Sequence, residues 1–269
     1  VLGHSYALIA DAMESVMDIF KALVVWGGLT IATQPPDENH PYGHGKAEPL
    51  AAIVVALTLV AGAIGLAIQS VREIMEPAFP PAPYTLIVLV GVVIVKELLF
   101  RYVSAVGEEI DSSAVKSNAW DNRSDAITSA AAFIGISIAL IGGEGYESAD
   151  DYAALFACGI IAYNGYRLLR PALGEIMDAA PPPDVEQGVR ATAGEVEGVQ
   201  TIERCMIRKM GLVYFVDLHV EVDGAVSVFE GHTIAHRVKN AIRRADSRIG
   251  EVLVHVEPAG GVDRSAKID

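Results

Sequence analysis

The sequence has little cysteine and few basic residues for its length. Its two cysteines, Cys158 and Cys205, lie far apart in a chain of 269 residues. Without a CxxC spacing they indicate neither a disulfide framework nor a thiolate zinc site. The 20 Lys and Arg residues are outnumbered by 34 Asp and Glu, which gives a net charge of -14. This balance argues against nucleic acid as a partner, because no basic face is available to neutralise phosphates, and it suits a protein that handles cations.

Long apolar stretches occupy the chain up to about residue 175 and account for its mean hydropathy of +0.37. A bilayer core requires ~20 apolar residues in a helix. We therefore predict membrane-spanning helices over residues 6–33, 51–71, 84–103, 118–142 and 149–169. A cleavable signal peptide is not expected, because no basic region precedes the first apolar run.

Basic residues near the ends of these stretches gather on one side of the expected membrane. That side carries Lys46, Arg101, Lys116, Arg167 and Arg170, whereas the other has Arg72. Cytoplasmic loops are enriched in Lys and Arg. We therefore expect a multi-pass protein of the cell membrane, with the loop after the first span and the C-terminal region in the cytoplasm.

The pattern changes after the prolines at 181–183. Residues 184–196 and 227–245 have helical periodicity, whereas residues 199–210, 212–223 and 250–257 resemble strands. The order α-β-β-α-β predicts a small α+β layer of ferredoxin-like or metallochaperone-like type. We expect a transmembrane domain over residues 1–178 and a cytoplasmic domain over residues 179–269.

Four carboxylates lie in pairs within two of the apolar helices. Glu14 precedes Asp18 by four residues, and Asp121 precedes Asp125 by four, so each pair shares one helix face. If the two faces meet inside the membrane, they form a cage for a divalent cation. An intramembrane ionisable residue costs at least ~2.5 kcal/mol, which makes each a functional candidate. The alternative for any of them is helix packing or lipid-headgroup contact, and Asp11, one turn earlier, is equally an access or a structural residue.

The polar loop after the first span contains Asp37, His40 and His44. Imidazole and carboxylate ligands suit zinc-like ions, so these residues are a candidate metal site at the membrane surface. The alternative is a turn whose backbone is set by Gly43 and Gly45, with solvated histidines.

Histidines and acids also mark the C-terminal region. His255 and Glu257 lie two apart on one strand, and His219 lies on the polar face of another, so period 2 places each set on one sheet face. His232 opens the second helix, and His236 follows one turn later as either a further ligand or a surface histidine.

These features resemble the cation diffusion facilitator family of divalent-metal transporters. Four motifs carry the resemblance: Ala10-Asp11-Ala12 with Ser15 and Asp18, His40-Pro41-Tyr42-Gly43-His44-Gly45-Lys46-Ala47-Glu48, Ala119-Trp120-Asp121-Asn122-Arg123-Ser124-Asp125-Ala126, and Leu253-Val254-His255-Val256-Glu257-Pro258. The resemblance spans nearly the whole chain. Members have six spans, so we expect the first to be missing before the five that are visible.

The resemblance implies a homodimer in the lipid bilayer that exports Zn2+, Mn2+, Fe2+ or similar ions from the cytoplasm in exchange for protons. It places the transport site on Glu14, Asp18, Asp121 and Asp125, and a weaker site on the histidine loop. The common zinc-type pattern has a histidine among the four transport positions, but here all four are carboxylates. Hard oxygen ligands favour Mn2+ or Fe2+, although zinc also accepts carboxylates.

The resemblance further makes residues 1–178 a transmembrane metal-transport domain and residues 179–269 a cytoplasmic dimerisation and metal-sensing domain. It implies metals that bridge two such cytoplasmic domains. Their expected ligands are Glu203, His219, His232, His255 and Glu257, with Glu203 standing where some relatives have histidine. Lys46 resembles one half of a cytoplasmic charge pair, with Asp178 as its expected partner across the dimer. A solvated lysine is the alternative.

Proton antiport is a hypothesis that follows from the cage itself. Four carboxylates cannot all stay ionised in apolar surroundings without a cation, so metal entry would expel protons and metal release would let them return. A rival interpretation is a membrane-anchored metal sensor or assembly scaffold without transport. An intramembrane enzyme is disfavoured, because the predicted spans contain neither a nucleophile motif nor HExxH.

Overall fold

The computed structural model describes residues 5–75, 82–109, 113–142, 146 and 148–260, excluding the side chains of residues 103, 106–109, 113–124 and 126. The chain divides into two units. The helical unit consists of Val1–Val24 and Ala52–Arg170, and the sheet unit consists of Val25–Ala51 and Pro171–Asp269.

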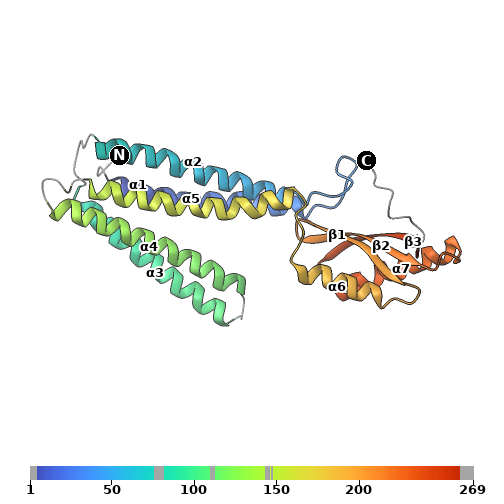
Figure 1. Ribbon diagram of the computed structural model, residues 1–269. Helices are drawn as coiled ribbons and strands as arrows, with labels where there is room; N and C mark the ends of the chain where they lie inside the picture. Colours follow the sequence, from blue (N-terminus) through green and yellow to red (C-terminus); the bar gives the residue numbers. More distant parts are fainter. Residues whose placement is uncertain (1–4, 76–81, 110–112, 143–145, 147, 261–269) are drawn as a thin grey trace. The chain divides into compact units, whose positions relative to one another are not determined.

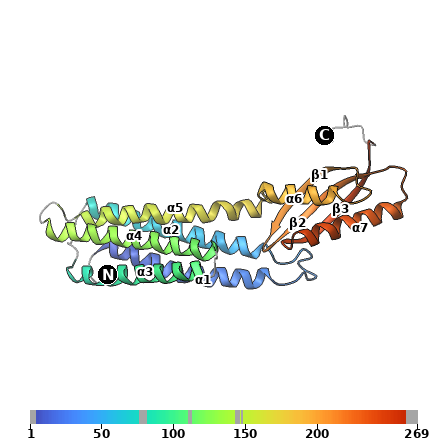
Figure 2. The same ribbon diagram turned by 90° about the horizontal axis from the view of Figure 1, so that it is seen from below.

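Five long helices form in the order predicted from the apolar stretches. They are α1 (Tyr6–Ala32), α2 (Ala47–Met75), α3 (Tyr84–Glu109), α4 (Ser113–Ile141) and α5 (Ala149–Ile176) (Figures 1 and 2). Among the described helices, α1 and α2 are long and apolar enough by themselves to cross a membrane, whereas α4 has a shorter apolar part, Ile127–Ile141. Charged residues such as Lys96 and Asp125 reduce the hydropathy of α3 and α4, and these charges turn out to lie at a polar cluster.

Small residues bring the helices of this unit close together. One core cluster joins Ala10 of α1 to α2 and α5, and another joins Ala7 of α1 to α3, α4 and α5. Helix α1 therefore contacts every other helix of the unit. Small residues at such interfaces allow the close backbone approach that stabilises helix pairs in membranes. The opposite side of α1 leaves large apolar side chains uncovered, including Ile19 and Trp26, which is 69% exposed.

The C-terminal region has the predicted α-β-β-α-β order. Its elements are α6 (Pro183–Gly194), β1 (Thr201–Met210), β2 (Val213–Val222), α7 (Val228–Ala245) and β3 (Ile249–Pro258). The sheet order is β1-β2-β3, with β1 antiparallel to β2 and β3 parallel to β2. Helix α7 makes the crossover that a parallel pair requires, and its N-terminus is capped by Ser227, which accepts a hydrogen bond from the Glu230 N–H.

Both helices cover one face of this sheet, and the other face is open (Figure 1). Along β2, Val216, Leu218 and Val220 are buried against α6 and α7, while Asp217 and His219 alternate with them on the open face. The predicted period-2 alternation of this strand is confirmed. Because of it, the side chains that could bind a metal lie on the open face.

Strand β1 contains one irregularity that the sequence pattern does not predict. Ile202 pairs with Val220 and Arg204 pairs with His219, so Glu203 is an extra residue in a β-bulge. A bulge re-aims the side chain that it inserts. Here it brings the Glu203 carboxylate to the His219 side of the sheet, 3.9 Å from the His219 Nδ1.

Candidate metal sites

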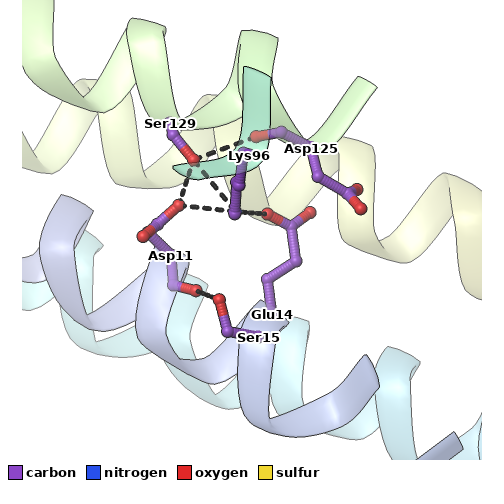
Figure 3. A network of polar contacts seen from close by, with 6 residues as sticks. All are labelled: Asp11, Glu14, Ser15, Lys96, Asp125 and Ser129. Carbon is purple, nitrogen blue, oxygen red and sulfur yellow. Dashed lines mark hydrogen bonds and ion pairs between the residues drawn. The ribbon is translucent and has the colours of Figure 1, made fainter. Parts of the chain in front are cut away.

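The buried carboxylates of α1 meet a cation from α3. Asp11 and Glu14 are only 3% and 5% exposed. The Lys96 Nζ lies 2.8 Å from the Asp11 Oδ1 and 3.3 Å from the Glu14 Oε2 (Figure 3). It also donates a hydrogen bond of 2.9 Å to the Ser129 hydroxyl of α4. Three helices thus converge on one ammonium group.

Ser129 holds this cluster together from the α4 side. Its hydroxyl is hydrogen-bonded to the Asp11 carboxylate and lies 3.0 Å from the backbone carbonyl oxygen of Asp125. In Figure 3 the Glu14 carboxylate lies between the Lys96 ammonium and the Asp125 carboxylate. Glu14 interacts electrostatically with both of them, so the cluster combines three carboxyl groups with one ammonium group.

The other two expected transport ligands are placed less completely. Asp18 lies on α1 one turn after Glu14 and is exposed in the single chain. Asp121 lies in α4, and its side chain is outside the described residues. The structure therefore brings Glu14 and Asp125 together, whereas it groups Asp11 with Lys96 rather than leaving it on an open pathway.

Lys96 is a functional candidate that the sequence analysis does not single out. It was visible as a charge inside an apolar stretch, and the argument applied to the four acids, that an intramembrane ionisable group needs a partner, applies equally to a lysine. What the spacing does not give is the identity of the partners, which come from helices far away in the sequence.

The predicted loop ligands lie together. The His40 Nδ1 is 3.3 Å and the His44 Nε2 is 3.4 Å from oxygens of Asp37. The ligand atoms of all three residues lie within 4.8 Å of one another. The His40 backbone N–H donates a hydrogen bond to Asp37, which lowers the pKa of this carboxyl and keeps it available as an anionic ligand. The three side chains are therefore arranged as a small metal site would require.

Two lysines, Lys46 and Lys209, form ion pairs and hydrogen bonds near the end of α5. The Lys46 Nζ lies 2.7 Å from the Asp178 Oδ1 and 2.5 Å from the backbone carbonyl oxygen of Glu175, at the end of α5. The Lys209 Nζ of β1 lies 2.9 Å from the Glu175 Oε2 and 3.6 Å from Glu48. The Lys46–Asp178 pair is made here within one chain, whereas the sequence interpretation placed it across a dimer. Lys209 and Glu175 carry no distinctive sequence spacing and were not identified beforehand.

Two glycines permit the loop to reach the β1–β2 turn. Gly211 has a φ of +63°, and a Cβ added there would be 3.0 Å from the Gly45 Cα. A Cβ added at Gly45 would be 2.6 Å from the Met210 carbonyl carbon. Gly45 therefore has a steric requirement, and Gly211 has both a steric and a backbone requirement.

The third group lies on the open face of the sheet. The His219 Nδ1 is 2.7 Å and the His255 Nε2 is 3.3 Å from the Glu257 Oε1. His219 and His255 are direct neighbours in the parallel register of β2 and β3, and the ligand atoms of these three residues lie within 4.8 Å of one another. By contrast, His232 lies on α7, where its ring contacts that of His236 at 4.5 Å between centroids.

The two acids of this cluster shift each other's pKa in opposite directions. A hydrogen bond with Glu257 raises the pKa of Glu203, and the same bond, together with His219, lowers the pKa of Glu257. Nearby, burial raises the pKa of Cys205 to about 11, so this cysteine packs against the core as a neutral thiol.

Two family models match the chain in succession. The cation efflux transmembrane domain matches residues 1–177, and the cation efflux protein cytoplasmic domain matches residues 181–259. Together these models cover both the helices with the buried carboxylates and the α+β layer with the open sheet face.

Similar proteins match along nearly the full chain. The manganese efflux system protein MneP of Bacillus subtilis is 30% identical over 96% of this chain and 88% of its own length. Magnetosome protein MamB of Magnetospira sp. is 32% identical over 96% of this chain and 87% of its own. Metal tolerance protein C1 of Arabidopsis thaliana is 30% identical over 96% of this chain and 58% of its own. The chain therefore belongs to the cation diffusion facilitator family of membrane proteins, with a helical transmembrane domain followed by a cytoplasmic α+β domain.

Proposed function

We propose that this protein exports a divalent transition metal from the cytoplasm across the cell membrane in exchange for protons. The transport ligands are Glu14 and Asp18 of α1 together with Asp121 and Asp125 of α4. The observation that carries this proposal is the burial of Glu14 among α1, α3 and α4, next to Asp125 and neutralised by a lysine. Packing alone does not require such an expensive arrangement inside a membrane helix bundle.

Among Mn2+, Fe2+ and Zn2+, we propose Mn2+ as the preferred substrate. Carboxylate oxygens are hard ligands. A site made of oxygen ligands alone favours Mn2+ or Fe2+, whereas a dedicated zinc site commonly includes nitrogen or sulfur ligands. A relative with manganese efflux in its name, at 30% identity over 96% of this chain, supports the same choice.

The histidine loop and the open sheet face would serve this transport as accessory sites. The loop set Asp37, His40 and His44 can collect metal near the membrane surface, and the sheet set His219, His255, Glu257 and Glu203 can sense cytoplasmic metal. We propose that His232 completes the latter from a second chain. A homodimer is supported by the open sheet face, where Leu253 is 65% exposed beside the cluster.

The transport proposal is tested in proteoliposomes with an imposed pH gradient. Metal added on the cytoplasmic side of the protein is expected to accumulate on the acidic side, because metal binding and proton binding compete for the same carboxylates. Mn2+, Fe2+, Zn2+ and Cd2+ are compared in one preparation by metal analysis of filtered vesicles. Accumulation that ignores the gradient would refute proton exchange. Movement of Zn2+ and Cd2+ alone would refute the hard-ligand argument, and no movement of any ion would favour a sensor or scaffold.

The sheet site makes a separate prediction. Replacing His255 with alanine is expected to weaken metal binding to the cytoplasmic domain about 10–100-fold, because one of few ligands is lost. The measurement is the metal-dependent rise in melting temperature of the full chain. Asp217→Asn, on the same open face, is the matched control and keeps the rise. An unchanged rise in His255→Ala would remove this residue from the site.

A further inference from the structure

The Lys96 ammonium lies beside Glu14, an expected transport ligand. Its ammonium group is surrounded by the carboxylates of Asp11 and Glu14 and by the Ser129 hydroxyl. The side chains of Asp11 and Glu14 are nearly inaccessible, and that of Lys96 is 13% exposed. A lysine so placed is more than a headgroup contact, because its charge lies within the bundle among the acids themselves.

The three contacts of Lys96 are unequal. Its Nζ is 2.8 Å from Asp11 and 2.9 Å from Ser129, but 3.3 Å from Glu14. Asp11 and Ser129 are in turn hydrogen-bonded to each other. The ammonium therefore has a firm anchor on one side and a looser contact on the side that faces Glu14 and Asp125.

Building on the proposed function, we propose that Lys96 is a tethered counter-cation of the transport site. It neutralises Glu14 when no metal is bound, and it withdraws to Asp11 and Ser129 when a divalent ion takes Glu14. Asp11 is then the acceptor that keeps the lysine in place, not a ligand of the metal. Lys96 acts through Glu14 and is a positioning residue.

This arrangement sets the affinity of the site. A cation that occupies Glu14 in the metal-free protein competes with the metal. The apparent Kd for the metal is then the intrinsic Kd divided by the fraction of sites that the lysine leaves free. The ammonium also remains near the bound ion and repels it. An exporter benefits from both effects, because a substrate that binds too tightly is released slowly.

The test is Mn2+ binding to the full chain, by isothermal titration calorimetry at mildly alkaline pH, in wild type, Lys96→Gln and Lys96→Arg. Removing the charge is expected to lower the Kd at least about tenfold, which corresponds to ~1.4 kcal/mol. Lys96→Arg keeps the charge and is expected to bind like wild type. In transport assays, Lys96→Gln lowers KM by a similar factor and also lowers kcat, because release becomes slower. If the lysine were purely structural, its replacement would not tighten metal binding while it lowers kcat.

Two further variants keep the outcome decisive. Lys96→Gln combined with Asp11→Asn removes both charges of the anchored pair, so it folds even if Lys96→Gln alone does not, and it is expected to show the same tight binding. Unchanged or weaker Mn2+ binding in a folded charge-removed variant would overturn the proposal. Glu14→Gln separates the two ideas: if it leaves binding and transport intact, the proposed transport site fails, whatever Lys96 does.

Discussion

Replacing Asp125 with asparagine is expected to lower Mn2+ transport by at least about a hundredfold, since the change removes an anionic ligand while keeping the shape of the side chain. The site must balance two positive charges of a metal in a helix bundle that already contains Lys96. Asp125 lies there beside Glu14, the other expected transport ligand that the structure places in this cluster. With Asp125 neutral, fewer carboxylates remain to balance the positive charges of both Lys96 and the metal. The measurement is the initial rate of Mn2+ uptake into proteoliposomes, normalised to the inserted protein.

Glu97→Gln is the matched control for this variant. Glu97 neighbours Lys96 in α3 but pairs with Arg101 on the exposed side of that helix. Its replacement is expected to leave the uptake rate within about twofold of wild type, since the charge that it removes pairs with Arg101 and not with the buried cluster. If Asp125→Asn transports Mn2+ at the wild-type rate, the four-carboxylate assignment is wrong.

Gly211→Val is expected to lower the stability of the sheet unit by about 2–4 kcal/mol, because a β-branched residue is forced into a left-handed backbone conformation and against another chain segment. The φ of +63° is the first cause, and the 3.0 Å approach of a new Cβ to Gly45 is the second. If Gly45 moves away from residue 211, the Lys46 Nζ also moves away from the Lys209 carbonyl oxygen, which lies 3.5 Å from it in the wild type. A fall in melting temperature of at least about 8 °C is expected for a unit of this size.

Gly188→Ala provides the opposite expectation. Gly188 lies in α6 with nothing within 4 Å of an added Cβ. Because alanine is the better helix former, the substitution is expected to stabilise α6 by ~0.5–1 kcal/mol. Thermal unfolding of both full-length variants, followed by protease sensitivity of the cytoplasmic domain, distinguishes them. Equal melting temperatures for Gly211→Val and wild type would show that the close contact with Gly45 is not required.

Periodicity in the sequence predicted most of the fold. The apolar stretches gave five helices because a membrane span leaves a long and simple signal. Alternation along β2 gave the buried and open faces directly, with Val220 inside and His219 outside. Spacing also predicted the histidine loop as a group, since Asp37, His40 and His44 are close in the chain and one turn can join them.

The contacts that connect distant elements were not predictable from one sequence. Lys96 meets Asp11 across 85 positions, and Lys209 meets Glu175 across 34. Such pairs depend on how helices and strands pack, which local patterns do not encode. The same limit explains why the sequence supports an access role and a structural role for Asp11 equally, because spacing alone does not identify its partner Lys96.

The bulge in β1 places the possible metal ligand Glu203 outside the alternation of side chains that builds the core. Ile202 and Cys205 both pack against the buried cluster, and Arg204 points to the open face. Deleting Glu203 would join Ile202 directly to Arg204, and the inward and outward order of the strand would stay the same. A single codon inserted or deleted at this position would therefore add or remove a carboxylate beside His219 while Ile202 and Cys205 keep their places at the core. The Glu203 ligand is therefore independent of the packing that holds the sheet on its helices.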